Sequence, residues 1–323
     1  MCKLIGKNKI KILFLLAFVF VLAFVVWLLL AQKSPEAAIM SANLTAITWA
    51  HAVNSDLLLT QYLNTDIQFL EADIVLGYLI NDTNKENKIP IMAHPPAEIS
   101  DLSLESFLRR IYEFNESHRD KVKGVKLDFK SILAFEQSNQ IIKDSYDMKK
   151  YETWINSDIL PGPVNNTETI PVDPIRFFAA ARKLDSAVLS IGWTTRWGSD
   201  FTDGEYSYKH VQDMISCLDV NNVSNISITY PVRAGIAANS LEQLMKLENE
   251  SSAKNKITFT IWSSADDFVD VSKLRVFIFT IGLDKIYVDV PDELKQKLRL
   301  NEPPINSEEL IALTDYEKKP IVY

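Results

Sequence analysis

Charged side chains alternate with apolar ones in two short segments of the chain. Glu71 and Asp73 lie in the segment FLEADI, and Lys126, Asp128 and Lys130 lie in the segment GVKLDFK. Successive side chains of a β-strand point to opposite faces, so each charged set shares one face of its strand. An unpaired charge inside a fold costs several kcal/mol. We therefore expect a bound cation or an anionic ligand to neutralise these groups, as at a functional site.

The three carboxylates offer only oxygen ligands, which indicates a hard cation, Mg²⁺ or Ca²⁺, with water completing its coordination shell. Zinc is less favoured because no cysteine or histidine spacing accompanies Glu71, Asp73 and Asp128. His51 and His94 would then be free to transfer protons, and either lysine of the second segment could hold an anion. A cation, two imidazoles and a lysine together form a workable site for cleaving a phosphodiester.

Strand-like and helix-like segments alternate along the body of the chain. The nine strand candidates are 45–53, 69–76, 89–94, 122–129, 154–160, 187–193, 225–230, 257–262 and 285–290. Helical spacing covers 57–63, 102–117, 132–142, 174–184, 208–218, 240–247 and 271–282. This alternation predicts an α/β protein with a (β/α)8 barrel of the TIM type, in which one of the nine strands is peripheral. An open doubly wound sheet is the alternative, but no glycine-rich nucleotide-binding motif follows any strand.

The unusual polar residues fall near the ends of these strands, where the βα loops of a parallel barrel converge on its active site. His51 closes the first strand, and the following strand ends carry Glu71 with Asp73, then His94, then Asp128 with Lys130, then Asp158. Taken singly, a buried histidine is more often a satisfied core residue, and a strand-end aspartate is more often a helix cap. Several such positions in one sequence favour a shared site.

The N-terminal segment has the properties of a membrane anchor. Residues 12–31 form a run of twenty residues without a charge, which as a helix spans about 30 Å, the thickness of a bilayer's apolar core. Four lysines precede the run and only Lys33 follows it closely. The positive-inside rule therefore predicts cytoplasmic residues 1–11, a transmembrane signal anchor at 12–31, a stem at 32–43 and an extracellular or luminal body at 44–323. A cleaved signal peptide followed by secretion is the alternative to this single-pass type II topology.

The body has further features of a protein that folds in the secretory lumen. Seven Asn-x-Ser/Thr sequons follow the apolar run, at Asn43, Asn81, Asn115, Asn165, Asn222, Asn225 and Asn249, and predict a glycoprotein. Cys217 has no intrachain partner in the body, which excludes a disulfide scaffold. Residues 34–323 hold 29 basic and 42 acidic side chains, because the first 33 residues contain five lysines and no acid. Such an acidic body argues against binding to nucleic acid.

Several linked motifs resemble the menorin family, within the superfamily of phospholipase-C-like and glycerophosphodiester phosphodiesterase barrels. The motifs are WAHAVNS at 49–55, EADI at 71–74, MAHPP at 92–96, KLDFK at 126–130 and WINSDILPGP at 154–163, with a late TIW at 260–262 and YVDVP at 287–291. The resemblance spans about Ala46 to Pro291. It implies a phosphodiesterase-type (β/α) barrel, a metal at Glu71, Asp73 and Asp128, and catalytic histidines at His51 and His94.

The chain also departs from the pattern of the phosphodiesterases. Their first histidine is usually followed by arginine, whereas His51 is followed by Ala52, and their second histidine is usually followed by Asp, whereas His94 is followed by Pro95. Their third carboxylate is usually Glu rather than Asp. These departures question a glycerophosphodiester substrate more than they question the metal. Arg196 or Arg233, each just past a strand, could replace the lost cation in binding phosphate, as could Lys126 or Lys130; Asp158 and Trp262 complete the candidate site.

Two functions fit this pattern. The first is a membrane-anchored or secreted hydrolase of phosphoric diesters that depends on a divalent cation and acts on an unknown substrate. The second is a catalytically silent cell-surface protein that binds protein partners in adhesion or morphogenesis, with the polar site inherited or used only to bind a ligand. A glycosidase-like barrel using Glu71 and Asp158 ranks below both, because sugar-stacking aromatic residues are not patterned in the sequence.

Overall fold

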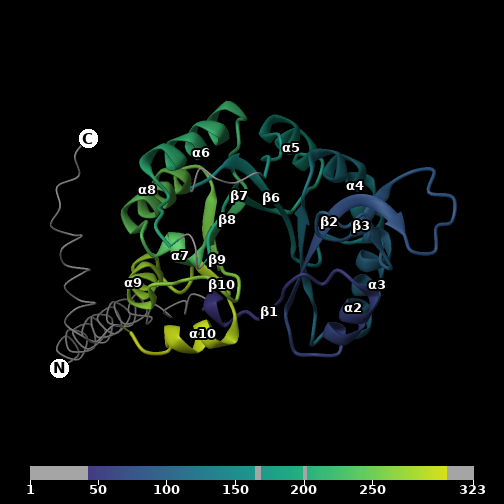
Figure 1. Cartoon of the computed structure of the whole chain (residues 1–323), viewed down its shortest axis with the longest axis horizontal. Coiled ribbons are helices and arrows are strands. Elements are labelled where there is room, and N and C mark those ends of the chain that lie inside the picture. The colour runs from purple at the N-terminus through teal and green to yellow at the C-terminus, as the bar shows by residue number, and fades with distance from the viewer. Residues whose placement is uncertain (1–42, 164–168, 199–201, 304–323) are drawn as a thin grey trace, which may run out of the picture. The chain divides into compact units, whose positions relative to one another are not determined.

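Alternating strands and helices wind into a nearly closed barrel in the computed structural model (Figure 1), which describes residues 43–163, 169–198 and 202–303. Parallel strands pair in the order β1-β2-β5-β6-β7-β8-β9-β10. Their bounds are β1 Trp49–Ala50, β2 Phe69–Leu79, β5 Gly124–Phe129, β6 Thr153–Pro161, β7 Val188–Thr194, β8 Ser227–Arg233, β9 Lys256–Trp262 and β10 Ile286–Asp289. The barrel predicted from the sequence is thus confirmed in its architecture.

Helices surround the strands and supply the apolar layer outside the barrel (Figure 1). They are η1 Leu44–Ala46, α2 Asp56–Leu63, α3 Leu104–Ser117, α4 Ile132–Ser145, α5 Pro174–Ala181, α6 Tyr208–Val220, α7 Ala234–Ala237, α8 Leu241–Ser252, α9 Val271–Ile281 and α10 Asp292–Leu298. In α3, the Ser103 side chain caps the first turn by accepting from the main-chain N–H of Ser106, and Phe107, Leu108 and Ile111 are fully buried. Local sequence therefore fixes both where such a helix begins and which face it buries.

The first and last strands of the barrel are joined by contacts between aromatic side chains and by a main-chain hydrogen bond from η1. The main-chain N–H of Leu44 in η1 donates to the carbonyl of Leu283, 2.9 Å away, just before β10. Inside the barrel the ring centroids of Trp49 and Tyr287 lie 6.0 Å apart, and those of Trp154 and Tyr287 lie 4.7 Å apart. These aromatic rings join β1, β6 and β10 across the base of the barrel.

The peripheral strand is the segment expected at 89–94. Its ordered part, β3 (Ile89–Met92), runs antiparallel to the outer half of β2, with Met92 opposite Ile74. A two-residue strand, β4 (Ile99–Ser100), pairs with the end of β2 and was not predicted. The first strand is also shorter than the expected 45–53. Strand β3 therefore does not contribute a wall of the barrel, although its end returns to the middle of β2.

The predicted anchor at residues 12–31 lies outside the described residues, as do Asn165 and most of the C-terminal tail. In the part of the chain that the structure describes, none of the helices has the length and apolar character needed to span a bilayer. Exposed asparagines occupy the sequons at Asn43, Asn81, Asn222, Asn225 and Asn249.

The prediction of a glycan at Asn115 does not fit the fold. Its side chain is fully buried in α3, where its amide group donates to the carbonyl of Lys123 at 2.9 Å and accepts from the main-chain N–H of Lys123 at 2.7 Å. An attached sugar would remove this hydrogen bond and displace the packing around it. The Asn-x-Ser spacing is thus satisfied at a position whose asparagine is a structural residue.

Candidate functional site

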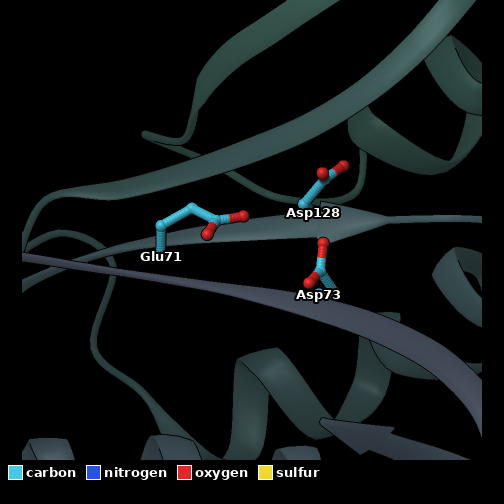
Figure 2. Close-up of side chains that lie close together, drawn as sticks. All are labelled: Glu71, Asp73 and Asp128. Carbon is cyan, nitrogen blue, oxygen red and sulfur yellow. The ribbon is translucent and has the colours of Figure 1, made fainter. Parts of the chain in front are cut away.

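Three carboxylates converge inside the mouth of the barrel (Figure 2). Glu71 and Asp73 project from β2, and Asp128 projects from the adjacent β5. The strand register sets Asp73 opposite Asp128, which makes their side chains neighbours. One oxygen from each lies within 4.8 Å of the others. The side chains are 1%, 7% and 17% exposed, respectively. This buried set of carboxylate oxygens could hold a metal ion, at the three residues that the sequence indicated.

Neighbouring amides hold two of these carboxylates in place. Asn54 donates from Nδ2 to Asp73 Oδ2 at 2.7 Å, and its Oδ1 accepts from the main-chain N–H of Asp73 at 2.9 Å. Asn156 on β6 donates to Asp128 Oδ1 at 2.7 Å and accepts from Ser190 Oγ at 2.5 Å. Sequence reasoning did not select either asparagine. Both lie inside the motifs at 49–55 and 154–163, and Asn156 shares the inward face of its strand with Asp158.

Lys126 on β5 and Lys130, directly after β5, differ in their contacts. Lys130 Nζ lies 2.8 Å from Asp73 Oδ1 and 2.6 Å from Asp128 Oδ2. Burial alone would lower the pKa of Lys130, but attraction to Asp128 and Asp73 outweighs burial and raises it. Lys126 is 4% exposed, and no hydrogen bond or ion pair joins its ammonium to another described residue. Lys126 is therefore a buried side chain whose ammonium has no such partner, and it is suited to hold an anionic ligand.

His51 contacts the carboxylate cluster from the end of β1. Its Nδ1 lies 3.3 Å from Glu71 Oε2 and 3.3 Å from Asp289 Oδ2 at the end of β10. The charge of Glu71 has the largest effect on the pKa of His51 and, with Asp289, raises it to about 9 against the opposing effect of burial. Burial in turn raises the pKa of Glu71, and His51 partly offsets that effect. The main-chain N–H of Ala52 also donates to Glu71 Oε2 at 2.8 Å.

His94 is not brought into contact with the carboxylates. It follows the antiparallel strand β3, its side chain is exposed, and its Nδ1 lies 2.7 Å from the carbonyl oxygen of Pro95. The preceding residue does reach the cluster through the main chain, because the N–H of Ala93 donates to the carbonyl of Asp73 at 3.0 Å. The two predicted catalytic histidines therefore differ, since only His51 touches a carboxylate of the cluster among the described residues.

Asp158 lies on the inward face of β6 without a side-chain partner among the described residues. Gly192 on β7 leaves room for it, because a Cβ there would stand 3.0 Å from Asp158 Oδ1. Burial, followed by repulsion from Asp128, raises the pKa of Asp158 to about 7. This carboxyl group is therefore placed to carry a proton near neutral pH.

Of the predicted arginines, Arg233 lies on β8, on the far side of the barrel from the carboxylates in strand order, and Arg196 follows β7, two strands from β5. Arg233, at the end of β8, donates from Nε and Nη2 to the two oxygens of Asp267 at 2.8 Å and 2.7 Å. Its guanidinium also lies 4.9 Å from the ring centroid of Trp262 at the end of β9. Arg233 is thus already matched by a buried carboxylate, which does not fit the expected role of a free phosphate ligand. Arg196 is exposed on the loop after β7.

Comparisons of this chain with known proteins identify a family and related proteins. The family model for the menorin N-terminal domain matches residues 43–295. Human protein FAM151B (Homo sapiens) is 34% identical over 249 residues, which cover 76% of this chain and 82% of that protein. Among solved structures, N2152 from Neocallimastix frontalis aligns with 80% of this chain and 63% of its own, at 12% identity and a TM-score of 0.41.

Proposed function

This chain belongs to the menorin family, and from the geometry of its barrel mouth we propose that it is a phosphodiesterase-like hydrolase dependent on a divalent cation, Mg²⁺ or Ca²⁺. The observation that carries the proposal is the convergence of Glu71, Asp73 and Asp128 beside a histidine that contacts Glu71. Oxygen ligands of this kind select hard cations over zinc. The substrate is an unidentified phosphoric diester.

The charge of the mouth supports a bound cation. In the described part of the chain, five carboxylates lie on neighbouring strands at the mouth, namely Glu71, Asp73, Asp128, Asp158 and Asp289. They outnumber the three cationic groups among them, Lys126, Lys130 and His51. Buried negative charge in excess is costly, and a divalent cation would offset it. When bound, such a cation neutralises phosphoryl oxygens and stabilises the charge that develops on them during cleavage.

The residues of the chain supply the remaining steps. Lys126 holds a phosphoryl oxygen through its unpartnered ammonium. His51 is oriented through Nδ1 by Glu71 and Asp289, which leaves Nε2 to exchange a proton with the attacking or leaving oxygen. Asp158 transfers the second proton, the role that the sequence had assigned to His94.

The remaining expectations extend this proposal to the whole protein. We propose a phospholipase-C-like type of barrel, displayed outside the cell or in the secretory lumen by the apolar segment 12–31. The five exposed sequons support a glycosylated surface. Secretion after cleavage of the N-terminal segment is the alternative.

A second function, a catalytically silent cell-surface interaction protein, is favoured by two observations. The His94 ring faces the carbonyl of Pro95 and not the carboxylates, and the arginine usual after the first histidine is absent. A site with these departures could bind a cation without turning over a substrate.

One experiment separates the two functions. Mg²⁺ and Ca²⁺ binding to the purified protein is measured by calorimetry, and a panel of phosphodiesters is assayed with wild type, Asp73→Asn and the exposed control Asp120→Asn. The hydrolase proposal predicts that binding and turnover are both lost in Asp73→Asn and both kept in the control. Cation binding without turnover of any diester would favour the interaction protein. Absence of cation binding in wild type would refute the metal centre.

A further inference from the structure

Lys130 occupies the place among the carboxylates where a cation would make its contacts. Its ammonium bridges Asp73 Oδ1 at 2.8 Å and Asp128 Oδ2 at 2.6 Å. The other oxygens of these two carboxylates accept hydrogen bonds from Asn54 and Asn156. Among the described residues, Lys130 is therefore the only cationic side chain that contacts Asp73 or Asp128.

A second lysine in the same cluster lacks such contacts. Lys126 Nζ has no hydrogen bond or ion pair with a described residue, although Lys126 is 4% exposed and lies opposite Glu71 in the strand register. Two ammonium groups, one on β5 and one directly after it, thus share the cluster, and only the second is bound to the carboxylate oxygens. A buried lysine without such contacts offers its ammonium to an anion that the chain itself does not supply.

We propose that Lys130 is an internal counter-ion that competes with the divalent cation for Asp73 and Asp128, and that its displacement couples cation binding to anion binding. An ammonium and a divalent cation cannot both hold these two oxygens at close range without mutual repulsion. Cation binding therefore releases Lys130 to join Lys126 in holding the anion. This inference rests on the proposed cation site and adds an order of binding, with the cation first.

Coupling of this kind is reciprocal. If the cation increases the affinity for an anion by some factor, the anion increases the affinity for the cation by the same factor. The bound cation attracts anions in any variant, so the share of the coupling due to Lys130 is the part that disappears when its charge is removed. A lysine that serves only to bind phosphate would leave the affinity for the cation alone unchanged.

The test compares Lys130→Met with Lys126→Met, which removes the same charge four residues earlier without removing a hydrogen bond or ion pair to the carboxylates. Mg²⁺ binding is measured by calorimetry on the full chain, without any anion. Competition predicts that Lys130→Met tightens the Mg²⁺ Kd by about tenfold or more, since a repelling charge in direct contact with the ligand oxygens is gone. Lys126→Met should change it by less than about threefold, because its charge is not bound to those oxygens.

A second measurement uses thermal unfolding in EDTA. Without the Lys130 charge the carboxylates of the cluster repel one another, so Lys130→Met should lower the Tm more than Lys126→Met does. A third measures inorganic phosphate affinity with and without Mg²⁺, and the increase caused by Mg²⁺ should be greater in wild type than in Lys130→Met. The phosphate measurement on wild type remains decisive even if Lys130→Met folds poorly. If Mg²⁺ does not increase the phosphate affinity of wild type, the coupling is overturned.

The failures can be told apart. If wild type binds Mg²⁺ but Lys130→Met binds it equally or more weakly, the competition is wrong and the cation site stands. Equal tightening in both lysine variants would also overturn it, since the effect would then be general charge and not displacement. If neither wild type nor Lys130→Met binds Mg²⁺, the cation site and the competition both fall.

Discussion

Replacing Asp158 by asparagine should change how the stability of the protein depends on pH. Burial and repulsion from Asp128 raise the pKa of Asp158 to about 7 in the folded chain, against 3.8 for an ordinary aspartate. Between these two values the folded protein holds a proton that the unfolded chain has released. Its free energy of unfolding therefore falls as the pH rises from about 4 through about 7.

The size of this effect follows from the shift in pKa. A difference of about three units corresponds to about 4 kcal/mol, at 1.36 kcal/mol per unit. Asp158 is only partly buried, so solvent screening reduces this figure and we expect about 1–3 kcal/mol. Asp158→Asn is uncharged at every pH and resembles the protonated carboxyl group. The variant should nearly match wild type near pH 4, where the carboxyl group is protonated in the folded chain and partly so in the unfolded chain, and exceed it by that amount near pH 8.

The assay is urea unfolding at pH 4, 5, 6, 7 and 8 in EDTA, which keeps divalent cations from masking the carboxylates. Asp266→Asn, at an exposed position in the loop after β9, is the control and should follow wild type throughout. Parallel curves for wild type and Asp158→Asn across this range would refute the reasoning. They would show that water or the lysines compensate the buried charge, and Asp158 would lose its place as a proton carrier near neutral pH.

Three further changes test the fold around the site by urea unfolding. Asn115→Ala should lower the free energy of unfolding by about 2–4 kcal/mol, because the main-chain N–H and carbonyl of Lys123 lose the hydrogen bonds of the Asn115 amide. The intact mass should show an unchanged glycan count. Arg233→Met should cost about 3–5 kcal/mol because the buried carboxylate of Asp267 loses its cationic partner; wild-type stability would contradict the ion pair. Gly124→Ala sets a Cβ 2.6 Å from the Phe69 ring and should cost about 1–3 kcal/mol, which Phe69→Leu should partly restore.

Much of the barrel could be predicted because its signals are local. The period of the apolar residues sets strand or helix, and serine and aspartate caps fix where several helices begin. The two-residue period of strands likewise assigns Glu71, Asp73 and Asp128 to inward faces before any contact is known. The barrel, and a carboxylate cluster at its mouth, follow from these patterns, since the carboxyl ends of parallel strands gather at one side.

The partners of the charged groups were decided by tertiary structure. Whether a lysine bridges two carboxylates or remains unpartnered depends on the register between strands, and the same alternation places Lys126 and Lys130 on one face with opposite outcomes. Because β3 runs antiparallel to β2, His94 contacts the carbonyl of Pro95 in its own loop. Arg233 forms an ion pair with Asp267 from a loop remote in the chain. Local sequence specifies the face on which a side chain lies, whereas its contacts arise only when segments remote in the chain are packed together.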